Sequence, residues 1–222
     1  MNSRIRRIQL GVTSTYLITG EEGYILVDAG EPGLTAKFKR IIGRWGIKPN
    51  TIRLLVITHA HYDHVGSLAE IKQWCDCPVL IHPYEEEILR QARIVIPPGT
   101  KVVGKVMSQV GSLLRPFMKF PACHGDLLVT ERYSLHSFGL DGIVLPTPGH
   151  TQGSLSVVLA SGEAMVGDLA MNFLGQDTFP IFGDDRQQIK QSGDLVKGEG
   201  VRIVYPAHGG AFPISRLGGT IS

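Results

Sequence analysis

The segment VITHAHYDHVGS, at residues 56–67, places three histidines and one aspartate within six positions. These donors are His59, His61, Asp63 and His64, and they follow the run IRLLVIT. A nearly continuous apolar run indicates a strand covered on both faces, as in many α/β sheets. Ligands in α/β proteins bind in the loops beyond the strand ends. The segment therefore favours an α/β fold with a functional site at a strand end.

Three further donor residues each follow an apolar run that predicts a strand. His150 ends LPTPGH, Asp168 ends AMVGD and His208 ends VYPAH, with prolines or glycines beside each of them. Small turn residues mark loops, and loops based on a rigid sheet are where binding residues concentrate. We therefore expect these three residues to belong to the same site.

Imidazole and carboxylate groups are ligands for Zn²⁺, Fe²⁺ or Mn²⁺, and the absence of cysteine among them argues against a closed structural zinc site. Seven donors are too many for one tetrahedral ion. They suit two ions held about 3.5–4 Å apart by a shared carboxylate, an arrangement found in hydrolytic sites. His59 and His61 could face one ion, and Asp63 and His64 the other.

Composition excludes several other classes. The 222 residues are 43% hydrophobic and 19% charged, which predicts one globular domain spanning residues 1–222. A net charge of +2 from 22 basic and 20 acidic residues gives no basic footprint for nucleic acid. No stretch approaches the ~20 apolar residues of a membrane span.

The N-terminus and the cysteines favour a cytoplasmic protein. The start MNSRIRRIQL is basic, but polar residues and a glycine interrupt the apolar segment that an export signal needs. Cys75, Cys77 and Cys123 are an odd number and make no disulfide framework. We expect ordinary thiols, with Cys75 and Cys77 at a helix end.

Periodicity and turn residues predict two runs of strands and helices. Residues 8–20 and 23–30 predict a two-stranded hairpin, residues 34–45 an amphipathic helix, and a second helix begins near Asp63 and runs through Trp74. A strand at 78–82 and a helix at 83–92 follow. Strands are then predicted at 133–138, 142–150, 153–161, 163–171 and 201–210, with a helix capped by Asp184 or Asp185. Two similar halves, each a mostly antiparallel sheet with outer helices, would form a four-layer αββα sandwich.

Residues 93–125 differ from the rest of the chain. They carry five basic residues and no acidic one, with apolar residues near helical spacing at Val102, Val106, Val110, Leu113, Leu114 and Phe117. We expect an inserted amphipathic helix that serves as an active-site lid or a dimer face. Contact with a membrane surface is the third alternative.

The donor pattern resembles the metallo-β-lactamase superfamily, whose His-x-His-x-Asp-His signature corresponds to His59–His64. YILVDAG with Asp28, TPGHTQGSLSVVL with His150, GD with Asp168 and PAHG with His208 follow in the family's order. The resemblance implies the family's αββα fold. It also implies that His59, His61 and His150 hold one metal, that Asp63, His64 and His208 hold a second, that Asp168 bridges them, and that Asp28 holds the metal loop by hydrogen bonds.

The same resemblance implies a hydrolase, with zinc expected and iron or manganese as alternatives. A hydroxide between the two ions would be the nucleophile, with Asp63 orienting it and passing a proton to the leaving group. We expect a small thioester or lactone as substrate. The alternatives are a mononuclear-iron dioxygenase of the persulfide type, a β-lactamase and a phosphodiesterase.

Only fourteen residues follow His208 (222 − 208), so we expect a short relative without the glutathione-binding helical domain of full-length hydroxyacylglutathione hydrolases. We also expect a small-molecule substrate, no nucleic acid and no stable membrane association, with a homodimer left open. His82, His124 and His136 have no partner motif and are expected to be structural or surface residues. Phe173, Phe179 and Phe182 line either a substrate pocket or the core.

Overall fold

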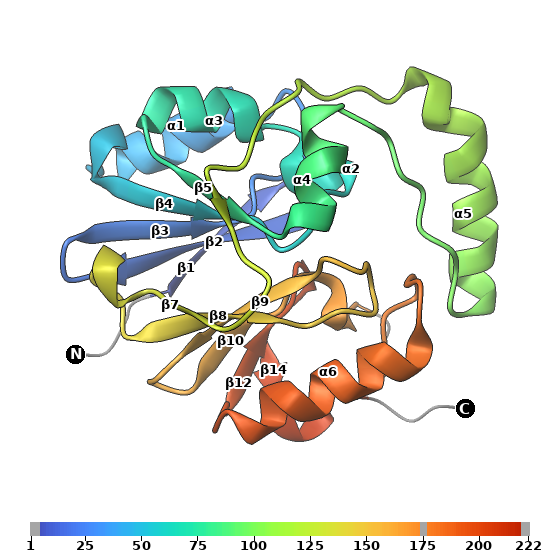
Figure 1. Cartoon of the computed structure of the whole chain (residues 1–222). Coiled ribbons are helices and arrows are strands. Elements are labelled where there is room, and N and C mark those ends of the chain that lie inside the picture. The colour runs from blue at the N-terminus through green and yellow to red at the C-terminus, as the bar shows by residue number, and fades with distance from the viewer. Residues whose placement is uncertain (1–4, 174–176, 219–222) are drawn as a thin grey trace.

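Two six-stranded sheets face each other in the computed structural model, which describes residues 5–173 and 177–218 (Figure 1). The first sheet consists, in spatial order, of β1 (Ile5–Leu10), β2 (Thr13–Gly20), β3 (Gly23–Val27), β4 (Ile52–Val56), β5 (Val79–Ile81) and β6 (Leu127–Leu128). The second consists of β14 (Phe212–Pro213), β12 (Ile203–Tyr205), β10 (Glu163–Met165), β9 (Leu155–Leu159), β8 (Gly142–Pro146) and β7 (Tyr133–Ser134). A separate pair joins β11 (Met171–Asn172) to β13 (His208–Gly209).

Helices cover the outer face of each sheet (Figure 1). The first sheet is covered by α1 (Thr35–Arg44), α3 (Leu68–Cys75) and α4 (Pro83–Arg90), and the second by α6 (Arg186–Gly198). The short α2 (Tyr62–Val65) lies in the loop after β4, and α5 (Val102–Leu114) lies to one side of the sandwich. Single 3₁₀ turns occur at Pro49–Thr51, Arg115–Phe117, His136–Phe138, Gly167–Leu169 and Ile214–Arg216.

Side-chain alternation explains why the sheets stack. Ile25 and Val27 of β3 point into the core between the sheets, whereas Leu26 between them points towards the helices. Leu54 and Val56 of β4 join the same central core with strands of the second sheet. Because both faces of these strands are buried, they are apolar almost throughout. The predicted αββα sandwich is confirmed.

The first sheet is mixed rather than mostly antiparallel. β1, β2 and β3 pair antiparallel, but β3–β4, β4–β5 and β5–β6 are parallel pairs. Parallel neighbours need a crossover, and α1 and α3 supply the first two. The second sheet is antiparallel except for the β10–β12 pair, as predicted for that half.

Glycines interrupt two predicted elements. Residues 8–20 form two strands, because Gly11 adopts a positive φ of 82° and turns the chain between β1 and β2. The helix predicted from Asp63 is two helices, α2 and α3, separated at Gly66 and Ser67. A Cβ on Gly66 would lie 2.2 Å from the ring of Pro32, so the chain passes too close there for any side chain.

Several predicted strands are also shorter than expected. The strand at 133–138 stops at Ser134 and continues as a 3₁₀ turn, and the strand at 163–171 stops at Met165. The hairpin turn at 20–23 and helices α1 and α4 agree with the predictions. Asp185 caps α6, because its Oδ1 accepts from the backbone N–H groups of Gln187 and Gln188.

Cys75, Cys77 and Cys123 are all free, with Cys75 at the end of α3. Within residues 5–173 and 177–218, none of the helices has the length and apolar character needed to cross a bilayer.

Candidate metal centre

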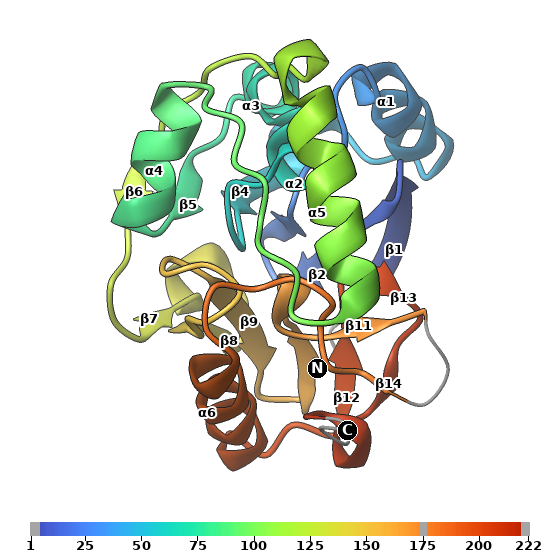
Figure 2. The same ribbon diagram turned by 90° about the vertical axis from the view of Figure 1, so that its right-hand side faces the viewer.

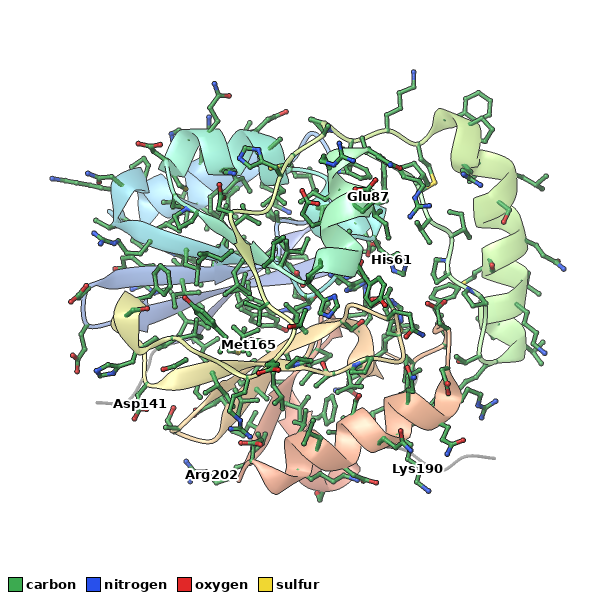
Figure 3. All side chains as sticks on the ribbon, in the orientation of Figure 1. His61, Glu87, Asp141, Met165, Lys190 and Arg202 are labelled. Atoms are coloured by element: carbon green, nitrogen blue, oxygen red, sulfur yellow. The ribbon has the colours of Figure 1, made fainter. Side chains whose placement is uncertain are left out.

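The predicted donors meet at one edge of the sandwich, where loops from both sheets converge. His59 to His64 follow β4 of the first sheet, and His150 lies in the loop after β8 of the second. Asp168 lies on the 3₁₀ turn after β10, and His208 begins β13, where it pairs with Met171 of β11. In Figure 3, the labelled His61 lies at the level between the two sheets, on the side that faces α5.

Three histidines from the two sheets form what we call the histidine group. It consists of His59, His61 and His150, which are all buried and each offer a ring nitrogen within 4.8 Å of the others. His61 Nδ1 and His150 Nε2 are 3.0 Å apart. Three imidazoles at this spacing could ligate one cation.

A second cluster, the mixed group, lies beside the first. It consists of Asp63, His64 and His208, whose ligand atoms also lie within 4.8 Å of one another. Asp168 lies between the two groups: its Oδ1 is 3.3 Å from both His64 Nε2 and His208 Nε2, and its Oδ2 is 3.5 Å from His150 Nε2. One carboxylate therefore reaches both groups of donors.

Hydrogen bonds on the far side of the rings orient these histidines. His64 Nδ1 donates to Asp28 Oδ2 at 2.9 Å, and His150 Nδ1 donates to the carbonyl of Phe182 at 3.1 Å. Each bond leaves the Nε2 lone pair pointing into the site, which is the usual arrangement behind a metal-binding histidine. Asp28 also accepts from the backbone N–H and the hydroxyl of Thr58, so it holds the loop as predicted.

Three buried donor atoms in this cluster make no hydrogen bond within the described residues. They are His59 Nε2, His64 Nε2 and Asp168 Oδ1. A buried polar atom without a partner destabilises a fold by about 1–3 kcal/mol. Orphaned atoms of this chemistry, aimed at one another, fit a cation as their common partner.

Electrostatics distinguish the two groups. Burial, followed by the neighbouring His150, lowers the pKa of His61 to about 3, so this imidazole is neutral. Burial would also lower the pKa of His208, but the carboxylates of Asp168 and Asp63 raise it to about 10. Burial would raise the pKa of Asp63, yet His64 and His208 hold it below its usual range. The mixed group thus has carboxylate charge beside its imidazoles, and this charge favours a bound cation.

Sequence reasoning missed Glu85, a buried residue of α4. Its Oε2 accepts from the N–H of Ala60, between two ligand candidates, and its Oε1 accepts from the N–H of Gly153. It also missed Thr13, whose hydroxyl donates to Asp63 Oδ2 at 2.6 Å. The only sequence signal for Glu85 was its place in the acidic first turn of a helix.

A cavity of about 550 Å³ opens onto the donor cluster. His61, Asp63, Asp168 and His208 line its polar end, and Met107, Ser108 and Gly111 of α5 cover it. Most of the remaining wall is apolar, with contributions from Ile96, Met171, Phe173, Ile181 and Phe182. Figure 2 shows the lower end of α5 close to β11 and β13 in this view.

The remaining histidines and phenylalanines singled out from the sequence lie outside the two donor groups. His82 caps α4 by accepting from the N–H of Tyr84, a structural role as expected. His124 and His136 are exposed, the latter in a 3₁₀ turn instead of a strand. Phe173 and Phe182 line the cavity, but Phe179 is buried in the core.

The chain is similar in sequence to one protein family and to curated relatives. The sequence model of the metallo-beta-lactamase superfamily matches residues 8–208. MJ0888 of Methanocaldococcus jannaschii, named a probable metallo-hydrolase, is 29% identical over 201 residues, covering 89% of this chain and 87% of the relative. YqgX of Bacillus subtilis, also named a probable metallo-hydrolase, is 27% identical over 163 residues, covering 72% of this chain and 68% of the relative.

Solved structures share the fold. The BLEG-1 B3 metallo-beta-lactamase superposes with a TM-score of 0.76 at 22% identity, covering 96% of this chain and 95% of that one. TTHA1623 in a di-iron-bound form gives a TM-score of 0.70 at 21% identity, covering 95% and 96%. At these identities the likeness concerns the fold alone.

Proposed function

Because this chain belongs to the metallo-beta-lactamase superfamily, we propose that it is a hydrolase that works with two divalent metal ions. The histidine group would hold one ion and the mixed group the other, with Asp168 shared between them. The position of Asp168 carries this proposal, because its two oxygens lie 3.3 and 3.5 Å from ring nitrogens of the two groups. The curated relatives named probable metallo-hydrolases support it.

When bound, such ions supply an acidified water and a Lewis acid for the carbonyl oxygen of a substrate. The chain's own groups have to position the reactants. The Thr13 hydroxyl fixes one oxygen of Asp63, which leaves this carboxylate at the end of the cavity. There it can orient the attacking water and pass a proton to the leaving group.

We propose a small ester-like bond, a thioester or a lactone, as the target. The wall of the cavity supports a substrate whose non-reacting part is apolar, because Ile96, Ile181 and Phe182 could bury such a group beside the donors. Zinc suits the mixed imidazole and carboxylate ligands, and iron or manganese would also fit them.

The test is hydrolysis by protein loaded with zinc, manganese or iron, on four substrates: a glutathione thioester, an acyl-homoserine lactone, a cephalosporin and an aryl phosphodiester. The parent should cleave the thioester or the lactone. Asp63→Asn should lower turnover at least ~10²-fold, the usual effect of losing an acid–base group, with an unchanged circular dichroism spectrum.

Asp76→Asn is the matched control. Asp76 ends α3 with a left-handed φ of 52°, which asparagine tolerates, so this variant should retain full turnover. Near-normal turnover in Asp63→Asn would reject the role of that residue. One iron per chain, with oxygen consumption on a persulfide instead of hydrolysis, would replace the proposal with the dioxygenase alternative.

A further inference from the structure

Helix α5 faces the protein with its small residues. Gly104 is its buried residue, and a Cβ there would lie 1.9 Å from the carbonyl oxygen of Ile181. One and two turns later, Ser108 and Gly111 line the cavity, and a Cβ on Gly111 would be 3.3 Å from Ile96. The helix therefore approaches the chain through a stripe with almost no side-chain volume.

Most of its large apolar side chains are exposed to solvent instead, and Met107 is exposed although it also lines the cavity. Eight residues between 102 and 117 are 50–82% exposed: Val102, Val103, Val106, Met107, Val110, Leu113, Leu114 and Phe117. Together they form an exposed apolar surface on one element, and a contiguous exposed apolar patch marks an interaction site. Figure 1 shows α5 standing at the side of the molecule, so no other described element covers this face.

The spacing of these residues is that of a helix–helix seam. Val103, Val106, Val110 and Leu113 recur at alternating steps of three and four, and Phe117 continues the pattern in the following 3₁₀ turn. In heptad terms they occupy a, d, a, d and a, with valine at two a positions and leucine at one of the two d positions. Valine at a with leucine at d favours two-stranded pairing. Gly104, Ser108 and Gly111 take the opposite positions b and f.

We propose that this seam is the interface between two copies of this chain, with α5 packing against α5 of the second copy. Each of the five seam residues is at least half exposed, so a partner helix can contact all of them. Between residues 102 and 114 the only charged residue is Lys105, which lies outside the seam, so two copies can meet without opposing charges.

A lipid surface fits this helix less well. A helix that lies on a membrane needs a charged face opposite its apolar one, whereas the opposite face of α5 is the glycine and serine stripe packed on the protein. A second helix needs no such charged face. The chemistry of α5 therefore favours a second copy.

The test is the molar mass of the full chain in solution by light scattering, over a dilution series. The parent should have twice the chain mass of 24.2 kDa. Val110→Glu places a charge in the seam at a half-exposed site, where the monomer fold has room for it, and should give a single-chain mass. Ser112→Glu adds the same charge two residues further along, at an exposed position outside the seam, and should remain dimeric.

Thermal unfolding of each variant verifies its fold, and flotation with phosphatidylglycerol vesicles tests the lipid alternative. A parent that is monomeric throughout, or a Val110→Glu variant that remains dimeric, would overturn the proposal. So would a parent that floats with the vesicles as a monomer while Val110→Glu does not. Mass does not depend on catalysis, so the failure of this proposal and failure of the proposed hydrolysis are distinguishable.

Discussion

Glu85 joins the two sequence segments that carry the histidine group. It is only 2% exposed, and its carboxylate accepts from Ala60 N–H at 2.8 Å and from Gly153 N–H at 3.2 Å. The first bond fixes the loop between His59 and His61, and the second fixes the loop after His150. The two loops follow strands of different sheets. The Glu85 side chain therefore fixes the distance between the loop at Ala60 and the loop at Gly153.

Glu85→Gln should destabilise the protein by about 1–3 kcal/mol, because the glutamine oxygen can accept from one of the two N–H groups and leaves the other unpaired. Urea unfolding measures this loss. Metal analysis after dialysis should also find lower retention, since the loops would no longer be held at one spacing.

Glu87→Gln is the control on the same helix. Glu87 forms an exposed pair with Arg90, and such pairs contribute about 0–1 kcal/mol. Equal stability and metal content in the two variants would contradict the positioning role of Glu85.

At the residue scale, the sequence predicts the metal-ligand residues better than the residues that hold them in place. His59, His61 and Asp63 stand in a pattern that few structural roles require, so their function is visible in one dimension. Glu85 lies in the segment PYEEE. Acidic residues are favourable at a helix N-terminus because of the helix dipole, so the sequence gives no reason to single out Glu85. Its hydrogen-bond partners are 25 and 68 residues away in the sequence, so no local sequence pattern could predict these contacts.

At the element scale, α5 depends on glycine where other helices do not. Gly99 and Gly104 let the start of α5 pack against the segment around Ile181, with a bridge between Gly99 and Phe182. The carbonyl of Phe182 in turn accepts from His150. The helix that covers the cavity is therefore connected to the donor cluster through a short chain of backbone contacts.

Gly104→Ala should displace α5, because the new Cβ would clash with the carbonyl oxygen of Ile181 and overpacking typically costs about 1–3 kcal/mol. Hydrogen exchange should show faster exchange at the amides of α5 while the sheets keep their protection.

Gly43→Ala is the control, and we expect the same added methyl group to stabilise the protein there. Gly43 lies in α1 with nothing within 4 Å of an added Cβ, so alanine should stabilise the protein by about 0.5–1 kcal/mol, measured by thermal unfolding. Unchanged exchange in α5 of Gly104→Ala would mean that the close approach at Ile181 does not hold the helix in place.

At the scale of the whole molecule, the candidate metal centre joins the two halves of the sandwich. His59 and His64 follow a strand of the first sheet, whereas His150 and Asp168 follow strands of the second. A cation bound here would add a further link between segments that also meet through the apolar core and through hydrogen bonds such as Leu155 N–H to the carbonyl of Thr58. Metal binding should therefore stabilise the whole fold and not only a loop.

Removing metal with a chelator should lower the melting temperature, and adding zinc back should restore it. A ligand at 100 times its Kd stabilises the native state by about 2.7 kcal/mol. His150→Ala should lose most of this gain, and the exposed His124→Ala should retain it. A melting temperature that stays constant while metal analysis shows complete removal would contradict a bridging centre.

The sequence by itself determined the donor types and their order, because ligand chemistry is a local property, and its resemblance to a known family implied the αββα layers. It overestimated the continuity of elements at Gly11 and Gly66, where contacts with distant residues demand a glycine. The resemblance to a known family already implied that Asp168 lies between two donor groups; only the tertiary structure decided that Glu85 supports them and that α5 exposes most of its large residues. Each depends on which segments pack together, and the single charged residue of α5, Lys105, is too little to distinguish its inner face from its outer face.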